Sequence, residues 1–288
     1  MTKLQWPGPV FNFTEGAFMS IQAPASASTS VQHAVQMLDQ AHALSRASSL
    51  VSTVLGADDV QAASAVQEIR IARSRAAGVR VVGRKIGLVG NEADQACMRA
   101  KPVCGTLLAE MEGLDGATLV PNWAFAPRVE GKLAFVLGRD LSVGFATLAD
   151  LVRAVEFVLP AAEVTESRMA GQTLTEVDLI ADNAGAAMFV LGATPRKLEQ
   201  LDLKLCGLTI ERNGEPAGFG TGIQAYGHPL NALHWLARHC AAGGQQLLAG
   251  DIVLAPALGP AVAVAPGDDL LIEIGGLGSI AFHLSDNK

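Results

Sequence analysis

The sequence lacks the patterns that mark several large classes of protein. Its four cysteines are scattered without CxxC spacing, so we interpret them as reduced, buried thiols rather than as nucleophiles or metal ligands. No apolar run approaches the length of a membrane span, and we find no basic region followed by an apolar core, so neither a membrane partner nor a secretory signal is expected. The formal net charge of -7 leaves no basic patch for a nucleic-acid partner, and we expect a cytoplasmic protein.

The chain also lacks a βαβ alternation, and no GxGxxG motif follows a predicted strand. Its 288 residues are 50% hydrophobic, which is enough to bury a sizeable core. We expect an irregular N-terminal arm over residues 1–30, a helical part over residues 31–115 and a β-rich, catalytic-type body over residues 116–288, all in one compact unit. A helical part that leads into a β-rich body indicates the α+β class.

Local patterns give the expected elements. Helices are predicted over Val31–Ser45 and Ala57–Ala77, with Asp58 or Asp59 as the start of the second, and a strand over Val79–Leu88. Two later helices are predicted over Leu148–Val158 and Pro229–Ala242. The other β-rich segments are short and bounded by turn residues: Ala134–Leu137, Met188–Leu191, Leu208–Arg212, Ile252–Ala255 and Leu270–Ile274.

The most informative residues are two glutamates and a lysine. Glu130 and Lys132 lie in an alternating segment that predicts a strand, so their side chains project from the same face. Glu163 lies in a second short segment with apolar flanks. A Glu-X-Glu strand with a distant third Glu would supply three carboxylates for a hard divalent cation. Here the second position of that pattern is a lysine.

Several segments in the same order resemble the 2-keto-4-pentenoate hydratase and 4-oxalocrotonate decarboxylase branch of the fumarylacetoacetate hydrolase superfamily. The likeness runs from about residue 32 to the C-terminus. The segments that carry it, besides the one around Glu130, are Gly83–Leu88, Ile180–Gly192, Gly220–Gly222, Gly227–Asn231, Ala249–Leu254, Gly267–Asp268 and Gly275–Ser279.

The resemblance implies a distorted β-barrel or β-sandwich with an N-terminal helical part, usually in a homo-oligomer. It also implies chemistry on small 2-oxo or 2-hydroxy-dienoic acids from aromatic catabolism. Members add water, decarboxylate vinylogous 2-keto diacids or cleave carbon–carbon bonds, normally with Mg²⁺ or Mn²⁺. A metal bound to such a substrate stabilises the developing enolate as a Lewis acid.

When the family's residues are matched one by one to this sequence, the resemblance implies that Lys85 is the active-site lysine, which binds a carboxylate or transfers a proton. Glu130 and Glu163 match two of the three carboxylates that hold the metal. Without the resemblance, all three would be interpreted as solvated charges. With it, they are candidate catalytic residues together with Lys132.

Four further residues are candidates for contact with the substrate. Asp182 and Asn183 match a recurrent segment of the family, although a turn that caps a strand explains the same pattern. Leu88 ends a matching segment, and Val103 lies beside a proline in a segment that departs from the family pattern; both would line the pocket.

The departures from the family pattern point to altered chemistry. Lys132 stands where the second carboxylate ligand belongs. Other positions that are usually polar have become apolar or lost their side chain: Ala100, Val103, Gly185, Ala186, Ala255 and Pro256. The apolar replacements favour a pocket for a larger or less polar substrate, such as a natural-product intermediate.

A lysine in place of a carboxylate changes the local charge by two units, so a divalent cation would meet repulsion and lose a ligand. The simpler arrangement has the ammonium group of Lys132 between Glu130 and Glu163, which satisfies all three buried charges. We therefore expect no tight metal site and no cofactor. If Mg²⁺ or Mn²⁺ binds after all, Glu130 and Glu163 would hold it.

Three functions remain open at this point. The first is an enzyme that acts on a 2-oxo acid through an enolate without metal, by hydration, decarboxylation or tautomerisation. The second is a metal-dependent hydratase or 4-oxalocrotonate-type decarboxylase. The third is a non-catalytic or repurposed chain, which associates with a homologous subunit.

Overall fold

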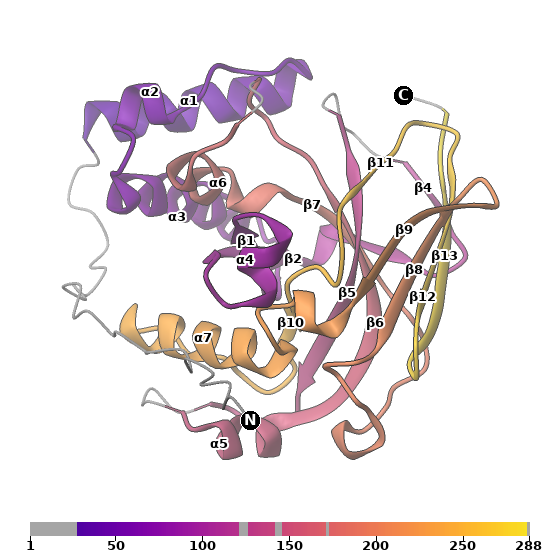
Figure 1. Ribbon diagram of the computed structural model, residues 1–288. Helices are drawn as coiled ribbons and strands as arrows, with labels where there is room; N and C mark the ends of the chain where they lie inside the picture. Colours follow the sequence, from indigo (N-terminus) through magenta and orange to yellow (C-terminus); the bar gives the residue numbers. More distant parts are fainter. Residues whose placement is uncertain (1–27, 121–125, 142–145, 171–172, 287–288) are drawn as a thin grey trace, which may run out of the picture.

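The computed structural model describes residues 28–120, 126–141, 146–170 and 173–286, so nearly all of the arm expected over residues 1–30 lies outside it. Helices gather on one side of two sheets (Figure 1). The first three are α1 (Thr29–Leu44), α2 (Ser52–Leu55) and α3 (Val60–Ala76). The side chain of Asp59 accepts a hydrogen bond from the amide of Ala62, which confirms the predicted start of α3.

The larger sheet contains the strands that carry the candidate residues. Its order within the described residues is β2-β1-β10-β5-β6-β7-β3, with β11 paired to β5. Most neighbours are antiparallel, but β1 pairs with β10 and β3 with β7 in parallel. The strands are β1 (Val81–Val89), β2 (Lys101–Leu108), β3 (Glu112–Leu114), β5 (Arg128–Leu137), β6 (Val155–Thr165), β7 (Ala186–Leu191), β10 (Ile252–Leu254) and β11 (Val262–Ala263).

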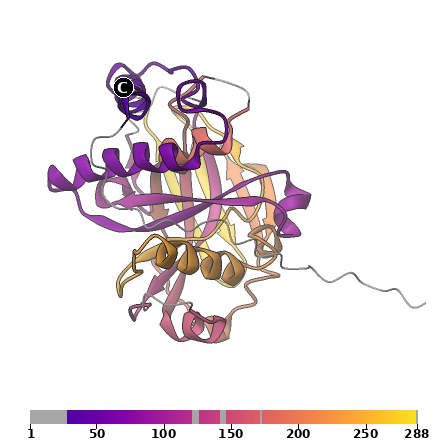
Figure 2. The same ribbon diagram turned by 90° about the vertical axis from the view of Figure 1, so that its left-hand side faces the viewer.

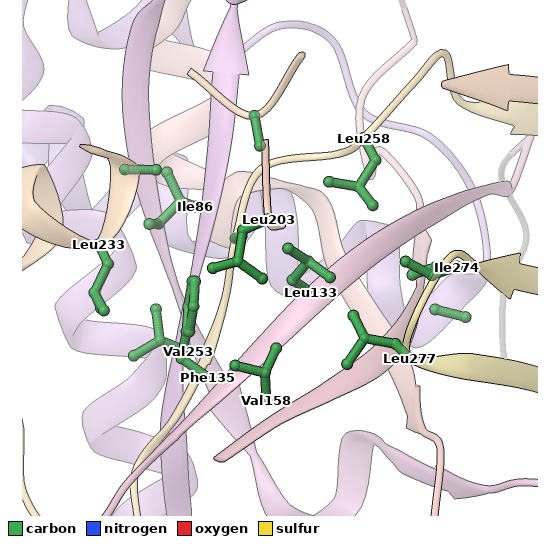
Figure 3. Packing of buried hydrophobic residues seen from close by; sticks show 14 of the residues in the cluster. Ile86, Leu133, Phe135, Val158, Leu203, Leu233, Val253, Leu258, Ile274 and Leu277 are labelled. Carbon is green, nitrogen blue, oxygen red and sulfur yellow. The ribbon is translucent and has the colours of Figure 1, made fainter. Parts of the chain in front are cut away.

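The smaller sheet has the order β4-β13-β12-β8-β9 and packs face to face against the larger one. Its strands are β4 (Thr118–Leu119), β8 (Gly207–Arg212), β9 (Glu215–Thr221), β12 (Asp269–Ile274) and β13 (Gly278–Leu284). Leu133 and Phe135 of β5 point into the space between the sheets and belong to one apolar cluster with Ile274 and Leu277 (Figure 3). The helix α7 (Pro229–Ala242) closes one end of this core through Leu233.

The remaining helices flank the outer strands of the large sheet. Figures 1 and 2 place α1 and α3 on one side of β1 and β2, and α7 on the other. A second apolar cluster joins α1, α2 and α3 to α6 (Glu176–Ala181). Asp178 of α6 is fully buried and accepts hydrogen bonds from the backbone amides and hydroxyl groups of Ser52 and Thr175, which ties α2 to α6. The short helices α4 (Glu92–Ala96) and α5 (Leu148–Ala154) complete the labelled set.

One predicted helix is wrong over its last residues. The helix expected over Leu148–Val158 ends at Ala154, and Val155 begins β6. Val155 lies opposite Leu137 of β5, and the alternating apolar residues that follow fit a buried strand better than a helix face. Pairing with β5 therefore overrides the local helical pattern.

The α+β fold class is confirmed: helices cover a curled sheet that packs on a second sheet. The strands β1 and β2, from the part expected to be helical, join the large sheet. The boundaries proposed at residues 30 and 115 stay predictions. None of the described helices combines the length and the apolar character that crossing a membrane requires.

Candidate active site

The candidate carboxylates lie on the face of the large sheet that turns away from the inter-sheet core. Odd-numbered residues of β5, such as Leu133, pack in that core, so Glu130 and Lys132 project from the opposite face. Glu163 of β6 is the direct cross-strand partner of Glu130. Alternation along two paired strands thus brings both carboxylates and one ammonium group together. The strand pattern in the sequence predicted the shared face of Glu130 and Lys132.

The ammonium group of Lys132 lies between the two carboxylates. Its Nζ is 3.1 Å from Oε2 of Glu130 and 2.5 Å from Oε2 of Glu163, and it donates a longer hydrogen bond of 3.4 Å to the carbonyl oxygen of Ile86. The Lys132 side chain is fully buried. An ammonium group has three N–H donors. Three oxygen atoms of the protein lie within reach of this one group.

Lys85 reaches the same carboxylate from β1. Its Nζ is 3.0 Å from Oε1 of Glu163 and donates a 2.7 Å hydrogen bond to the carbonyl oxygen of Ala184. Three strand spacings separate β1 from β6, about 14 Å in a flat sheet, so the contact requires the sheet to curl. Gly105, opposite Lys85 on β2, leaves room for this side chain, because an added Cβ would lie 2.9 Å from its Cγ.

The pKa values of the two lysines shift in opposite directions. Burial would lower the pKa of Lys132, but the carboxylates of Glu163 and Glu130 outweigh it, and the pKa lies above its ordinary value. Burial lowers the pKa of Lys85, and the nearby Lys132 adds to this effect while Glu163 only partly offsets it. Burial would also raise the pKa of Glu130, but the ammonium groups of Lys132 and Lys85 hold it below its ordinary value. Lys132 is thus the fixed cation, and Lys85 is the one closer to releasing a proton.

Lys85, Lys132 and Glu130 line a cavity of about 250 Å³, whereas Glu163, which both lysines contact, is not part of its lining. Its charged members are Lys85, Arg128, Glu130, Lys132 and Glu166. Its other members combine apolar or small residues, including the predicted Leu88 and Val103, with three polar ones: Gly87, Leu88, Gln95, Val103, Ala126, Thr165, Ser167, Leu174, Leu179, Ala184, Gly185 and Ala257. A small organic acid fits in a cavity of this volume.

A tight turn positions one wall of this cavity. Asn183, Ala184 and Gly185 all have positive φ, and Ala184 is an alanine held in the left-handed region at φ 53° and ψ 29°. The amide side chain of Asn183 accepts a 2.7 Å hydrogen bond from the backbone N–H of Thr106 and donates a 2.9 Å bond to its carbonyl oxygen. The turn is thereby fixed to β2, and the Ala184 carbonyl oxygen points at Lys85.

The structure places the remaining predicted residues outside this cavity. Asp182 forms a 2.9 Å ion pair with Arg168 and is buried, and Asn183 borders a neighbouring hollow of about 260 Å³ together with Arg168. Both residues lie just behind the cavity wall. Their part in substrate binding stays a prediction.

Glu166 was not predicted as a site residue, yet it lines the cavity. It lies three residues after Glu163, and strand alternation would direct it to the other face. The strand β6 ends at Thr165, however, and the chain bends before Glu166. Only the charged run Glu163, Glu166 and Arg168 in the sequence could have drawn attention to it.

The residues present do not fit a divalent metal ion between the two glutamates. The Lys132 ammonium group contacts both carboxylates at the place where the ion would lie, so a cation there would meet a positive charge at contact distance. Within the described residues, no group of three or more His, Cys, Asp or Glu side chains could hold a metal. The positive charges that contact Glu163 in the described residues are the ammonium groups of Lys85 and Lys132.

Comparison with known proteins decides the family. The sequence profile of the fumarylacetoacetate (FAA) hydrolase C-terminal family matches residues 84–285, which includes all four candidate catalytic residues. The chain belongs to the fumarylacetoacetate hydrolase family. Its match covers both sheets and the helix α7.

Curated and solved relatives refine this placement within the family. The chain is 44% identical over 230 residues to the TodF product hydratase of Pseudomonas putida strain F1, which covers 80% of this chain and 86% of the relative. It is 41% identical to the 2-keto-4-pentenoate hydratase of Paraburkholderia xenovorans, with the same coverage. The structure of 4-oxalocrotonate decarboxylase from Pseudomonas putida G7, complexed with magnesium and adipate, superposes with a TM-score of 0.81 at 28% identity and covers 88% of this chain and 97% of that one.

Proposed function

We propose that this protein is a lyase of the hydratase type that adds water to a small 2-hydroxy-dienoic acid through its 2-oxo form, with ammonium groups in the place of a metal ion. The observation that carries the proposal is the pair of buried lysines that share Glu163 beneath a small cavity. The names of the relatives that are 37–44% identical, all hydratases, support hydration. The cavity volume supports a substrate of the size those names describe.

The two lysines have different parts in this proposal. Three protein oxygen atoms surround the ammonium group of Lys132, so this residue acts as a fixed positive charge that links Glu130 and Glu163. Lys85 has two acceptors among the described residues, which leaves one N–H for a ligand in the cavity. We assign Lys85 the hydrogen bond to the 2-oxygen of the substrate, where negative charge develops in the enolate.

The reaction balances as two steps. In the first, the 2-hydroxyl group loses its proton, C5 gains one, and the C2=C3 and C4=C5 double bonds become a C2=O and a C3=C4 bond. In the second, water adds its oxygen to C4 and a proton to C3. Both steps pass through an enolate at C2, so a donor and a fixed positive charge near the 2-oxygen lower both barriers.

Decarboxylation is the second candidate, because loss of carbon dioxide from a vinylogous 2-keto diacid forms a related enolate. Arg128 lines the cavity from an exposed position and could pair with a second carboxylate. The solved decarboxylase, with magnesium and the diacid adipate, supports this alternative for the present chain. A homo-oligomer, a homologous partner subunit and a cytoplasmic location are also proposed on the basis of the family relationship.

The test is turnover of 2-hydroxypenta-2,4-dienoate, followed by its ultraviolet absorbance in chelator-treated protein with and without Mn²⁺. We expect turnover that Mn²⁺ does not increase, and a loss of roughly 10²- to 10³-fold in kcat for Lys85→Met. Turnover that depends on Mn²⁺ would refute the role of the ammonium groups. No turnover of this acid, but release of carbon dioxide from 2-oxohex-3-enedioate, would favour the decarboxylase.

A further inference from the structure

Glu166 is a cavity carboxylate that the ammonium groups do not neutralise. Its Oε1 is 3.0 Å from Nη2 of Arg168, while its Oε2 is buried and has no hydrogen-bond partner among the described residues. A buried carboxylate oxygen without a partner is costly, and such an atom beside a cavity indicates a group that meets a ligand or exchanges a proton.

We propose that Glu166 is the catalytic residue that carries the proton between the 2-oxygen and the carbon chain of the substrate. The proposal rests on the proposed function, because it assigns one group of that reaction. In the first step, the Glu166 carboxylate accepts the proton of the 2-hydroxyl group, and the resulting carboxylic acid donates it to C5. The carboxylate is regenerated, so the step needs no further reactant. In the second step the same carboxylate takes a proton from the attacking water and gives it to C3, the position at which a saturated 2-oxo acid also exchanges its protons.

The other two carboxylates are less suited to this task. Glu163 is buried between Lys85 and Lys132, with an ammonium nitrogen within 3.0 Å of each oxygen. Glu130 is held by Lys132, and its lowered pKa makes it a weak base. A proton on either glutamate would weaken the ion pairs that the site is built on.

Glu166 also has the environment of a proton carrier. Burial raises the pKa of Glu166 above its ordinary value, the guanidinium group of Arg168 partly offsets this, and the carboxylate of Asp182 adds to it. A carboxyl group with a raised pKa is easier to protonate near neutral pH and can act as base and acid in turn. The other charged groups that line the same cavity are Lys85 and Lys132, which are buried, and Glu130 and Arg128, which are more exposed.

A line of alternating charges fixes the position of Glu166. Arg168 binds Glu166 with one nitrogen and Asp182 with another, at 3.0 Å and 2.9 Å. Asp182 also lies 3.6 Å from Arg70, which binds Asp39 of α1 at 3.0 Å. Arg168 is thus a positioning residue: it keeps one oxygen of Glu166 anchored while the other remains free.

The experiment measures deuterium exchange at C3 of 2-oxopentanoate in D₂O by proton NMR, as a function of pH, with the binding of the same acid measured by calorimetry. This saturated acid forms the enolate but cannot be hydrated. We compare wild type, Glu166→Gln and Glu166→Asp. The control is Glu176→Gln, the same change at a surface carboxylate that pairs with Lys101 at 2.8 Å.

We expect Glu166→Gln to slow exchange by at least about 100-fold with less than roughly a threefold change in binding, and to remove the acidic limb of the pH profile. Glu166→Asp, which stays ionisable, should retain part of the rate and a shifted limb, which a purely structural role would not produce. Glu176→Gln should behave as wild type. Unchanged exchange in Glu166→Gln, with its pH limb intact, overturns the assignment alone. If Glu166→Gln does not fold, an exchange rate and a pH profile in Glu166→Asp that equal those of wild type overturn the assignment of Glu166. If the wild-type protein itself shows no exchange, the proposed function is overturned together with the assignment.

Discussion

Restoring a carboxylate at position 132 should convert the lysine-centred site into a metal site. The change Lys132→Glu removes an ammonium group that lies 3.1 Å from Glu130 and 2.5 Å from Glu163, and places a third carboxylate beside them. Because this breaks buried ion pairs, the metal-free variant should lose about 3–5 kcal/mol of unfolding free energy. At roughly 2–4 °C per kcal/mol for a domain of this size, the melting temperature should fall by about 6–20 °C.

A divalent ion should recover much of that loss. If Mn²⁺ binds with a Kd about 100-fold below its concentration, the variant gains about 2.7 kcal/mol, or roughly 5–11 °C. Wild type should change by less than about 2 °C under the same conditions, because Lys132 occupies the place of the ion.

The assay is thermal unfolding of chelator-treated protein with and without Mn²⁺, with the control Lys132→Met. Methionine also leaves Glu163 with only one cation, so the control should be destabilised, but it supplies no third carboxylate and should not respond to the ion. An equal response to Mn²⁺ in wild type and Lys132→Glu would refute the reasoning, and so would a Lys132→Met variant that is rescued as well as Lys132→Glu.

Two further predictions concern the elements that frame the cavity. Asp178→Ala should lower the free energy of unfolding by about 3 kcal/mol, because its fully buried carboxylate accepts four hydrogen bonds. The control Asp150→Ala removes the same kind of cap from the exposed start of α5 and should lower the free energy of unfolding much less. Ala184→Gly should raise the free energy of unfolding by roughly 0.5–1 kcal/mol. Glycine removes the steric cost of the left-handed backbone in the folded state, and this gain is larger than the extra entropy that glycine gives the unfolded chain. The control Ala186→Gly, at φ −64°, should lower the free energy of unfolding. Chemical denaturation checks both pairs, and a stabilised Ala186→Gly or a neutral Asp178→Ala would contradict them.

The sequence predicted the parts of the site that local alternation controls. The strand pattern around Leu133 placed Glu130 and Lys132 on one face, and the exchange of a carboxylate for an ammonium group implied the contact of Lys132 with both glutamates. The turn signal at Asp182-Asn183 was also visible. Its alternative interpretation as a turn agrees with the hydrogen bonds that fix Asn183 to β2.

Contacts that depend on distant pairing were beyond local patterns. Lys85 meets Glu163 only because β10, from late in the chain, inserts between β1 and β5 and the sheet curls. Glu166 enters the cavity because the chain leaves β6 after Thr165, where alternation stops applying. The helix expected up to Val158 failed for the same reason, because pairing of Val155 with β5 decides the boundary.

The lysine at position 132 also affects the total charge beneath the cavity, and therefore the electrostatic attraction of an acidic ligand. A divalent ion together with the carboxylate that helps to hold it carries one net positive charge, and so does one ammonium group. With Lys85, Glu130 and Glu163 retained, the exchange therefore leaves the total charge beneath the cavity unchanged. In the proposed metal-free site the cation is covalently part of β5, so its presence would not depend on the supply of metal ions. An anionic substrate would meet the same overall attraction, from a charge that no chelator can remove.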